Sequence, residues 1–383
     1  MVGSASGRPG KWQATAVGLV GLSVLLAGCG SARDLACPGF VLPRPASEYD
    51  FAPFASEPRA RLGGTPYMGY YTLFAMADPD RLGQHSYQGV WTPGETSRGT
   101  LYTARAGFID VAHMRKSIDW TAFHYVRIRT AIDEGWPCIK LPSKEPSVYF
   151  LNFKYPAFWD EMGAEERASL AHELAIRLAV ELSHVQLTWH EIATWFGYRS
   201  TPLSEKPSAF TYEDPVSHLL GGRIAAEALS ERNSDFNEAV TRHLADTLKE
   251  IEVVPEDKAY EAIRLVQDKW WNQRAGGRPM KRQVDFGLDD GVIKPWLVLD
   301  LPGYAKRQAV PLRLPEIDRI DGRDLRGFCL IECEPNMGIW SRLRNKLPGD
   351  PKRLRPKEHF PVLERLIRQE VIAADGPAAV EPY

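Results

Sequence analysis

The sequence predicts a mainly α fold of the α+β class, with a helical core and a smaller β-rich part toward the C-terminus. One observation is a long helical pattern at about 164–196, where apolar residues recur every three or four positions. They are Leu174, Leu178, Leu182, Val185, Trp189, Ile192 and Phe196. The other observation is a change at residue 281, after which short apolar runs alternate with Gly, Pro and Asp-Gly turns, a pattern typical of strands.

The remaining elements follow from the same patterns. Residues 67–79 are aromatic and apolar without a clean period, which favours an extended segment packed on the core. Residues 107–133 have helical spacing, and residues 146–156 lie between prolines and end in alternation, which predicts a strand. The 164–196 helix is apolar on two sides, so we expect it to be central, with neighbours on both. Further helices are expected at 213–230, 235–251, 256–273 and 359–373.

The N-terminus has the pattern of a secretory signal. Arg8 and Lys11 precede the apolar run "ATAVGLVGLSVLLAG", which is shorter than the roughly 20 residues of a membrane span. The run ends in Leu-Ala-Gly before Cys29, which resembles a bacterial lipobox and implies removal of residues 1–28 and lipidation of Cys29. The alternative is an ordinary signal peptide or an uncleaved anchor. Gly30, in place of Asp, favours the outer membrane, so we expect a lipid-anchored envelope protein facing the periplasm.

The rest of the chain divides by composition. Residues 29–60 are expected to form a tether, residues 61–280 a helical core domain, and residues 281–383 a β-rich segment with a C-terminal helix packed on that core. The net charge of −2 gives no electrostatic case for nucleic acid. The expected partners are therefore the membrane, through the lipid, and an envelope component.

Four cysteines besides Cys29 allow three disulfide connectivities. They are Cys37, Cys138, Cys329 and Cys333. The last two lie on an expected strand, about 13 Å apart at ~3.3 Å per residue, and cannot bond to each other. Each of these two cysteines either pairs elsewhere or stays free and buried. No cysteine has a histidine at the spacing of a zinc finger.

The stretch "LTWHEIATW" contains part of a zinc motif. His190 and Glu191 match the start of H-E-x-x-H, but Thr194 replaces the second histidine. His190 therefore needs ligands or hydrogen-bond partners from other segments, because burying it unpaired is costly. A core histidine bonded to a backbone carbonyl is the other interpretation.

The same helix has a second polar surface. Glu181 and His184 are three residues apart, the spacing by which bundle helices supply ligands to di-iron centres. No second Glu-x-x-His occurs in the chain, so a salt-bridged or solvated helix edge is the favoured interpretation.

Two further segments pair acids with histidines. Asp110 and His113 lie one helical turn apart, either as a carboxylate orienting a functional imidazole or as a local hydrogen bond. Glu213 and Asp214 fall in the first turn of the 213–230 helix, where the helix dipole favours acids, and His218 follows one turn later.

The segment around these residues offers simpler roles as well. Ser208 or Thr211 is a candidate cap for the 213–230 helix. Arg115 and Asp119 are spaced for a salt bridge. Gly221 and Gly222 permit either close helix contact or a break.

Three stretches taken together resemble the signature blocks of an uncharacterised bacterial family, domain of unknown function 4056. They are "GFIDVAHMRKSID", "WHEIATWFGYRS" and "EKPSAFTYEDPVSHLLGG". The likeness covers roughly residues 60–330, and the family brings no activity with it. The resemblance implies that the acids and histidines of these blocks belong to the signature. The family pattern often has Asn at the position of His218, which weakens the case for that residue as a ligand.

One functional hypothesis is an envelope hydrolase that depends on zinc or another divalent metal. His113, His190 and a carboxylate from Glu191, Glu213 or Asp214 would leave an open position for water, with a free acid such as Asp110 nearby as a catalytic group. His218 is a further candidate ligand. The substrate would be a peptide, a peptidoglycan fragment or a lipid. A metal-free version would use Ser208 as nucleophile, although no G-x-S-x-G elbow surrounds it.

The alternative hypothesis is a non-catalytic, lipid-anchored binding or structural protein of the envelope. It needs only a tether, a stable helical core and an exposed patch. Trp270 and Trp271 suit a binding surface as well as a core. The acids and histidines would then be helix caps and buried hydrogen-bond partners.

Overall fold

A computed structural model describes Cys37 and most of the chain from residue 56 to residue 382. The described ranges are 56–59, 61, 76–87, 94–143, 145–199, 204–231, 234–272 and 278–382. The expected signal peptide, the lipidated Cys29 and nearly all of the tether lie outside these residues, as does most of the expected extended segment at 67–79. The described residues from Cys37 onward belong to one compact unit.

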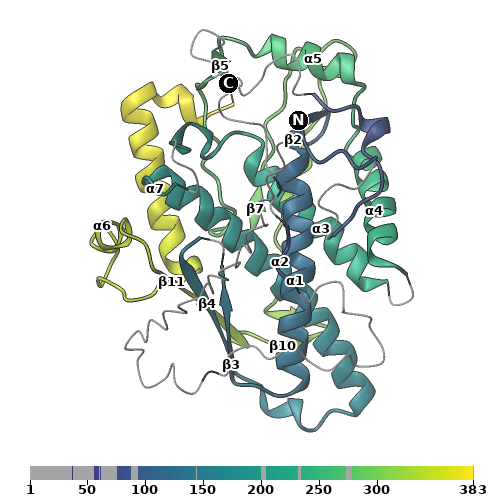
Figure 1. Ribbon diagram of the computed structural model, residues 1–383, viewed down its shortest axis with the longest axis vertical. Coiled ribbons are helices and arrows are strands. Elements are labelled where there is room, and N and C mark those ends of the chain that lie inside the picture. The colour runs from purple at the N-terminus through teal and green to yellow at the C-terminus, as the bar shows by residue number, and fades with distance from the viewer. Residues whose placement is uncertain are drawn as a thin grey trace, which may run out of the picture. The chain divides into compact units, whose positions relative to one another are not determined.

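Three helices form the centre of this unit. Helix α1 (Val111–Asp133) packs against both α2 (Ala164–Trp195) and α3 (Asp214–Ser230), and the three lie together in Figure 1. Nearly every residue of α1 is buried, because it has helices on two sides. The long helix predicted from the apolar stripe is α2. The prediction of a mainly helical α+β fold is confirmed.

Helix α1 begins later than its apolar spacing suggests. Residues Gly107–Asp110 form strand β2, which pairs in antiparallel fashion with β1 (Thr100–Thr103). Asp110 ends the strand and caps the helix, because its carboxylate accepts a hydrogen bond of 2.9 Å from the backbone N–H of His113. The expected helix over 107–133 is thus correct only from Val111.

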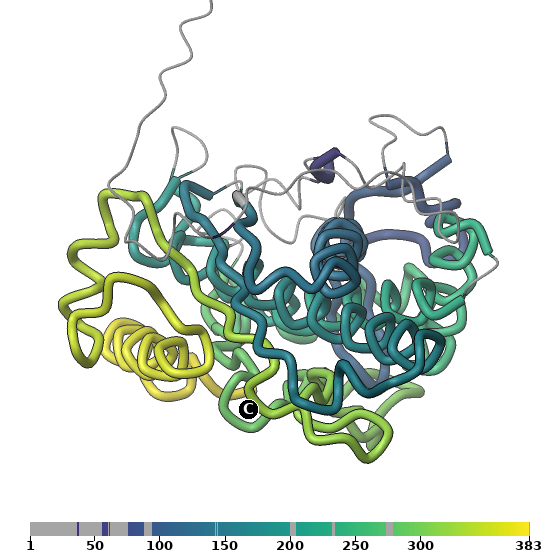
Figure 2. The backbone as a smooth tube through the Cα atoms, turned by 90° about the horizontal axis from the view of Figure 1, so that it is seen from below, coloured from purple at the N-terminus to yellow at the C-terminus, as the bar shows by residue number. Residues whose placement is uncertain are grey.

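A three-stranded antiparallel sheet joins early and late parts of the chain. Its order is β11 (Cys329–Pro335), β4 (Ser147–Phe153) and β3 (Cys138–Pro142). Helix α7 (Pro356–Asp375) contacts β11 and α2, and Figure 2 shows it as a yellow coil beside the yellow-green backbone that precedes it in the chain. Trp189 of α2 stacks on Phe360 of α7 with ring centres 6.1 Å apart. Residues on both sides of position 280 thus share one sheet and one core.

The smaller elements surround this arrangement. They are α4 (Phe236–Glu250), α5 (Glu256–Leu265), β5 (Trp271–Asn272), β6 (Arg278–Pro279), β7 (Val292–Ile293), β8 (Leu312–Arg313), β9 (Arg319–Ile320), β10 (Arg323–Asp324), α6 (Trp340–Arg344) and 3-10 turns at Pro79–Arg81, Ala157–Trp159, Lys206–Ser208 and Pro377–Val380. No helix among the described residues is long and apolar enough to span a bilayer.

Helix α5 is shorter than its predicted range of 256–273. It ends at Leu265, and Asp268 adopts a positive φ of 59°, which a helix does not allow. Trp271 then lies in β5, where its indole N–H donates to the carbonyl of Ile263 at 2.9 Å. The indole ring is buried, so the tertiary contact decides the end of the helix.

The structure shows which cysteines pair, a question that the sequence left open. Cys37 and Cys138 form a disulfide, which joins the segment before the core to the start of β3. Cys329 and Cys333 are free and both lie on β11, as the expected spacing along a strand requires.

Gly221 sets the distance between α1 and α3. A Cβ atom added at Gly221 would lie 2.2 Å from the carbonyl oxygen of Met114 on α1. A Cβ added at Gly222 would instead lie 3.0 Å from a side-chain methyl of Val180 on α2. The two glycines therefore permit close helix contact and not a break, because α3 continues to Ser230.

We expect Gly221→Ala to lower the free energy of unfolding by about 2 kcal/mol or more, because a backbone carbonyl cannot rotate away from the new methyl group. Gly222→Ala is the matched control. It should cost less than about 1 kcal/mol, since the Val180 side chain can move and Ala has the better helix propensity. Urea denaturation measures both, and equal losses would contradict this account of the packing.

Candidate functional site

Acids and histidines from three helices meet where the N-termini of α1 and α3 approach the C-terminal end of α2. We call this group the acid–histidine cluster. Its members are Asp110, His113, Glu191, Glu213, Asp214 and His218. Two hydrogen bonds fix the approach of α1 to α3. The backbone N–H of Asp110 donates to Ser217 Oγ at 2.9 Å, and Ser117 Oγ donates to the carbonyl of His218 at 2.6 Å.

His113 is held by an acid from another helix. Its Nδ1 lies 2.9 Å from Oδ1 of Asp214, and its ring centre lies 5.3 Å from that of His218. The side chain keeps 24% of its surface exposed. Burial alone would lower the pKa of His113, but Asp110, Asp214 and Glu191 together raise it to about 10. His113 is therefore an imidazolium at neutral pH.

Asp214 is fixed from the other side by its own loop. Its Oδ2 accepts from both the backbone N–H and the hydroxyl of Thr211, at 2.9 and 2.8 Å. Thr211 was a candidate cap for α3, which would make its side chain an acceptor for the first turn of the helix. Instead Thr211 donates both hydrogen bonds, and Asp214 in the first turn accepts them. These bonds leave Oδ1 directed to His113.

Two carboxyl groups of the cluster titrate far above their ordinary range. Burial and the charge of Asp214 raise the pKa of Glu191 to about 7. Burial and the charges of Asp214 and Asp110 raise the pKa of Glu213 to about 8. Glu191 also accepts a hydrogen bond of 3.3 Å from the backbone N–H of Phe210. A buried carboxyl group that gains and loses a proton near neutrality is typical of an acid–base catalyst.

A small cavity lies against the cluster. Its volume is about 10 Å³, enough for about one water molecule. Its lining comes from α2, α3 and the segments around Phe210 and Phe286: His184, Thr188, Glu191, Phe210, Asp214, Pro215, His218, Asp285 and Phe286. The His218 ring is buried and makes no hydrogen bond with the described part of the chain. Burial and the charges of His113 and Lys116 lower the pKa of His218, which is therefore neutral.

His190 is directed to a different acid. Its Nδ1 lies 2.8 Å from Oε1 of Glu145, which precedes β4, and 21% of its side chain is exposed. Burial alone would raise the pKa of Glu145, but His190, Lys116 and Ser143 lower it to about 2. The charge of His190 also acts on Glu191 and His218. His190 thus adjoins the cluster without pairing with any of its acids.

Lys116 connects the two groups electrostatically. It follows His113 by three residues on α1, so both side chains lie on the same side of that helix. Its charge acts on Glu145, Glu191 and His218. Neither Glu145 nor Lys116 was identified from the sequence, because no motif links the residue before Pro146 to His190, 45 positions later.

Other predicted residues have structural partners. His184 is buried and lies 2.7 Å from the carbonyl of Phe286, so the solvated or salt-bridged edge expected for this residue is wrong; it also lines the cavity. Glu181 is buried and pairs with Lys357 at 3.1 Å. Ser208 Oγ donates to the carbonyl of Glu205 at 2.6 Å. Asp119 pairs with Arg61 at 2.6 Å, which replaces the salt bridge to Arg115 suggested by their spacing.

The predicted metal ligands are spread over two groups. His113 lies with Asp214, whereas His190 lies with Glu145. Within the described ranges, no three His, Cys, Asp or Glu side chains are placed so that they could hold a metal ion together.

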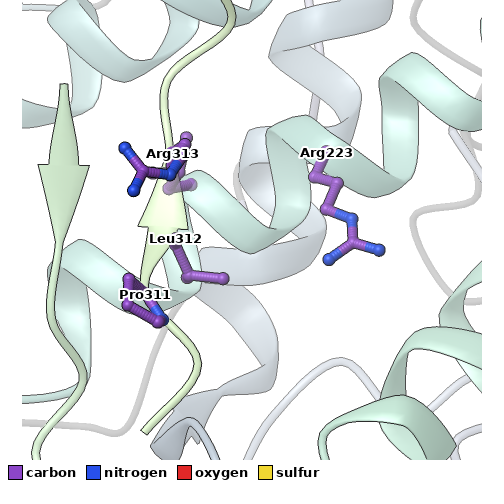
Figure 3. A pocket seen from close by; sticks show the side chains of 5 residues that line it. Arg223, Pro311, Leu312 and Arg313 are labelled. Atoms are coloured by element: carbon purple, nitrogen blue, oxygen red, sulfur yellow. The ribbon is translucent and has the colours of Figure 1, made fainter.

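A larger pocket of about 220 Å³ lies elsewhere, between α3 and β8. Figure 3 shows Arg223, Pro311, Leu312 and Arg313 on its walls, with the two guanidinium groups pointing away from each other. Arg223 is paired with Glu227 and Glu250 at 2.9 and 2.7 Å. None of the residues predicted from the sequence lines this pocket.

The raised pKa values of Glu191 and Glu213 make stability depend on pH. Between about pH 4.5 and pH 8 the folded chain holds protons that the unfolded chain has lost, so the free energy of unfolding falls as the pH rises. We expect the Glu191→Gln substitution to make the decrease in the free energy of unfolding with pH smaller by up to about 3 kcal/mol, because the amide does not titrate. The amide oxygen can still accept the hydrogen bond from the backbone N–H of Phe210.

Urea denaturation at pH 5 and pH 8 measures this difference. Glu316→Gln, a substitution at an exposed acid, is the control and should leave the wild-type difference unchanged. A Glu191→Gln variant that loses as much stability as the wild type between the two pH values would contradict the assignment of a neutral, buried carboxyl group.

Comparison with known proteins gives one match. The family described as "Protein of unknown function (DUF4056)" matches residues 43–282. No curated protein and no solved structure matches the chain. The matched region covers more than half of the chain and contains all three sequence blocks, so the resemblance is confirmed and this chain belongs to the DUF4056 family.

Proposed function

We propose that the chain is a lipid-anchored protein of the bacterial envelope that hydrolyses an acyl substrate at the acid–histidine cluster. The observation that carries the proposal is the placement of Glu191 and Asp214. These two buried acids come from different helices and line the same water-sized cavity, and the pKa of one of them is raised to about 7.

The chemistry of acyl hydrolysis requires a group that gives a proton to the leaving group. Glu191 fits this role because its carboxyl proton is retained up to neutral pH and because it faces the cavity. The ion pair of Asp214 with His113 keeps a negative and a positive charge fixed beside it. Such fixed charges stabilise a developing charge without having to reorient during the reaction.

The burial of the cluster supports a functional role over a structural one. Pairing acids with each other in the protein interior raises the pKa of Glu191 and Glu213 and so destabilises the fold at neutral pH. Active sites commonly retain such unfavourable arrangements because the chemistry depends on them.

The envelope location rests on the N-terminal sequence and gains support from the disulfide. Cys37 and Cys138 are bonded, and disulfides persist in oxidising compartments such as the periplasm. The lipobox-like sequence at Cys29 favours attachment through lipid.

We expect Glu191→Gln to lower the rate of hydrolysis by about 100-fold or more, the usual contribution of a general acid. The measurement is product release from chromogenic esters, peptides and peptidoglycan fragments between pH 5 and pH 9. Glu181→Gln is the control, because Glu181 is a buried acid of the same helix that pairs with Lys357 away from the cluster.

The Glu191→Gln variant should be at least as stable as the wild type at pH 8, so unfolding cannot explain a lost activity. Metal analysis of the tag-free protein shows whether zinc or another divalent ion takes part. If the wild type hydrolyses none of these substrates, or if Glu191→Gln is fully active, the hydrolase proposal fails. The non-catalytic binding protein is then the better account.

We expect Cys29→Ser to abolish incorporation of labelled fatty acid and to release the protein from the membrane fraction. The thioether to the lipid needs the cysteine sulfur, and the remaining signal sequence cannot supply it. Recovery of a lipid-labelled Cys29→Ser protein would refute the lipid anchor. A Cys37→Ser variant, which removes a different N-terminal thiol, should keep its label.

A further inference from the structure

We propose that a chain of hydrogen-bonded side chains fixes His190 in the tautomer that carries its proton on Nδ1, which leaves Nε2 as a proton acceptor. The proposal deepens the proposed hydrolase, because it supplies the base that the reaction needs. The chain runs through residues of α1, α2 and the loop between β3 and β4. Its members, in order of contact, are His124, Gln186, Ser143, Glu145 and His190.

The direction of each hydrogen bond follows from the chemistry of the groups. Glu145 is a carboxylate, which can only accept. Ser143 Oγ–H therefore donates to its Oε2 at 2.5 Å, and His190 Nδ1–H donates to its Oε1 at 2.8 Å. Ser143 has then used its single hydrogen, so it accepts from the amide N–H of Gln186 at 3.1 Å.

The far end of the chain agrees with this assignment. Gln186 donates through Nε2, so its Oε1 faces His124 and accepts from Nε2–H of that ring at 2.7 Å. Burial lowers the pKa of His124 to about 3, so the ring is neutral and has one proton to donate. Each of the four contacts then joins one donor to one acceptor, and with a neutral His190 ring no other assignment of the protons satisfies all four.

The chain is rigid because of where it lies. The side chains of His124, Gln186 and Glu145 are buried, with 1, 3 and 5% of their residue surface exposed. Their elements belong to the core of the molecule, since α1 packs against α2 and the loop is closed by β3 and β4. A flipped Gln186 would place its amide NH₂ against His124 Nε2–H and its oxygen against Ser143, which would leave buried polar groups without their partners.

His190 is partly exposed at the end of the chain. Its side chain is 21% exposed, and Nε2 makes no hydrogen bond with the described residues. Lys116 and Glu191 lie close enough for their charges to interact with this region, and the ring of Tyr198 contacts His190 edge-on at 6.2 Å. A histidine that is held at Nδ1 by a carboxylate and open at Nε2 has the geometry of a general base.

The reaction step balances with the groups present. His190 Nε2 takes a proton from water as the water oxygen bonds to the acyl carbon. The bond from that carbon to the leaving group then breaks, and the carboxyl proton of Glu191 goes to the leaving group. His190 later releases its proton to solvent, and Glu191 takes one up. In this scheme Glu145, Ser143, Gln186 and His124 are positioning residues that act through His190.

The test reads the imidazole directly. In the folded mature protein labelled with ¹⁵N-histidine, two-bond ¹H–¹⁵N spectra at alkaline pH show which ring nitrogen of His190 carries the proton. We expect Nδ1–H as the main neutral form. Assignment uses His190→Gln, which removes only this ring. If the neutral wild-type ring carries its proton on Nε2, the proposal is overturned, whether or not the protein is a hydrolase.

Two variants and one matched control locate the cause. Glu145→Gln should shift the neutral ring toward Nε2–H and lower any hydrolysis by about 100-fold or more, because an amide can donate to Nδ1. Ser143→Ala should cause a smaller shift in the same direction. Ser147→Ala removes another buried hydroxyl, which accepts from Trp189 Nε1 at 3.0 Å, and should leave the tautomer unchanged.

The outcomes separate this inference from the proposed function. If the His190 ring carries its proton on Nδ1 but the protein has no hydrolase activity, the positioning chain is supported and only the hydrolase proposal fails. An active enzyme whose His190 tautomer does not respond to Glu145→Gln refutes the chain. An equal tautomer shift in Ser147→Ala would assign the effect to general loosening of the hairpin and would also refute it.

Discussion

The close packing of α1 against α3 at Gly221 determines where the acid–histidine cluster lies. The absence of a side chain at Gly221 lets the backbone of α3 approach Met114 on α1. That approach brings the first turns of the two helices together, so that His113 reaches Asp214 and the backbone of Asp110 reaches Ser217. Helix α2 completes the site because it packs on both and presents Glu191 to the same place.

Electrostatics then distinguish the members of the site by their surroundings. Asp214 and Glu191 are both buried, but Asp214 has Thr211 and His113 as partners, whereas at Glu191 burial and the charge of Asp214 outweigh the charges of His190, His113 and Lys116. The first arrangement favours a charge and the second favours a neutral carboxyl group. His113 and His190 each face an acid through Nδ1, but the acid of His190 is itself held by a chain of hydrogen bonds that reaches back to His124.

Much of the fold could be read from local patterns. The apolar stripe of α2, the acids in the first turn of α3 and the strand between Pro146 and Pro156 are local features, and the structure contains all three elements. The predicted helix ends were wrong where contacts between residues far apart in the sequence decide where a helix begins or ends. The helix expected from Gly107 starts at Val111 because residues 107–110 pair with β1. The helix expected to reach 273 ends at Leu265, where Trp271 turns back to bond Ile263.

The sequence by itself determined the family to which the chain belongs, and it singled out the acids and histidines of the three blocks as the candidate site residues. It also predicted a signal peptide and lipid attachment at Cys29. Only the tertiary structure decided which acid serves which histidine. Helix spacing suggested that Asp110 pairs with the His113 side chain. The Asp110 carboxylate instead accepts from the backbone N–H of His113, and Asp214 holds the His113 ring. Glu145 reaches His190 across 45 positions because the β3–β4 hairpin packs beside α2, and such a contact leaves no periodic trace in the sequence.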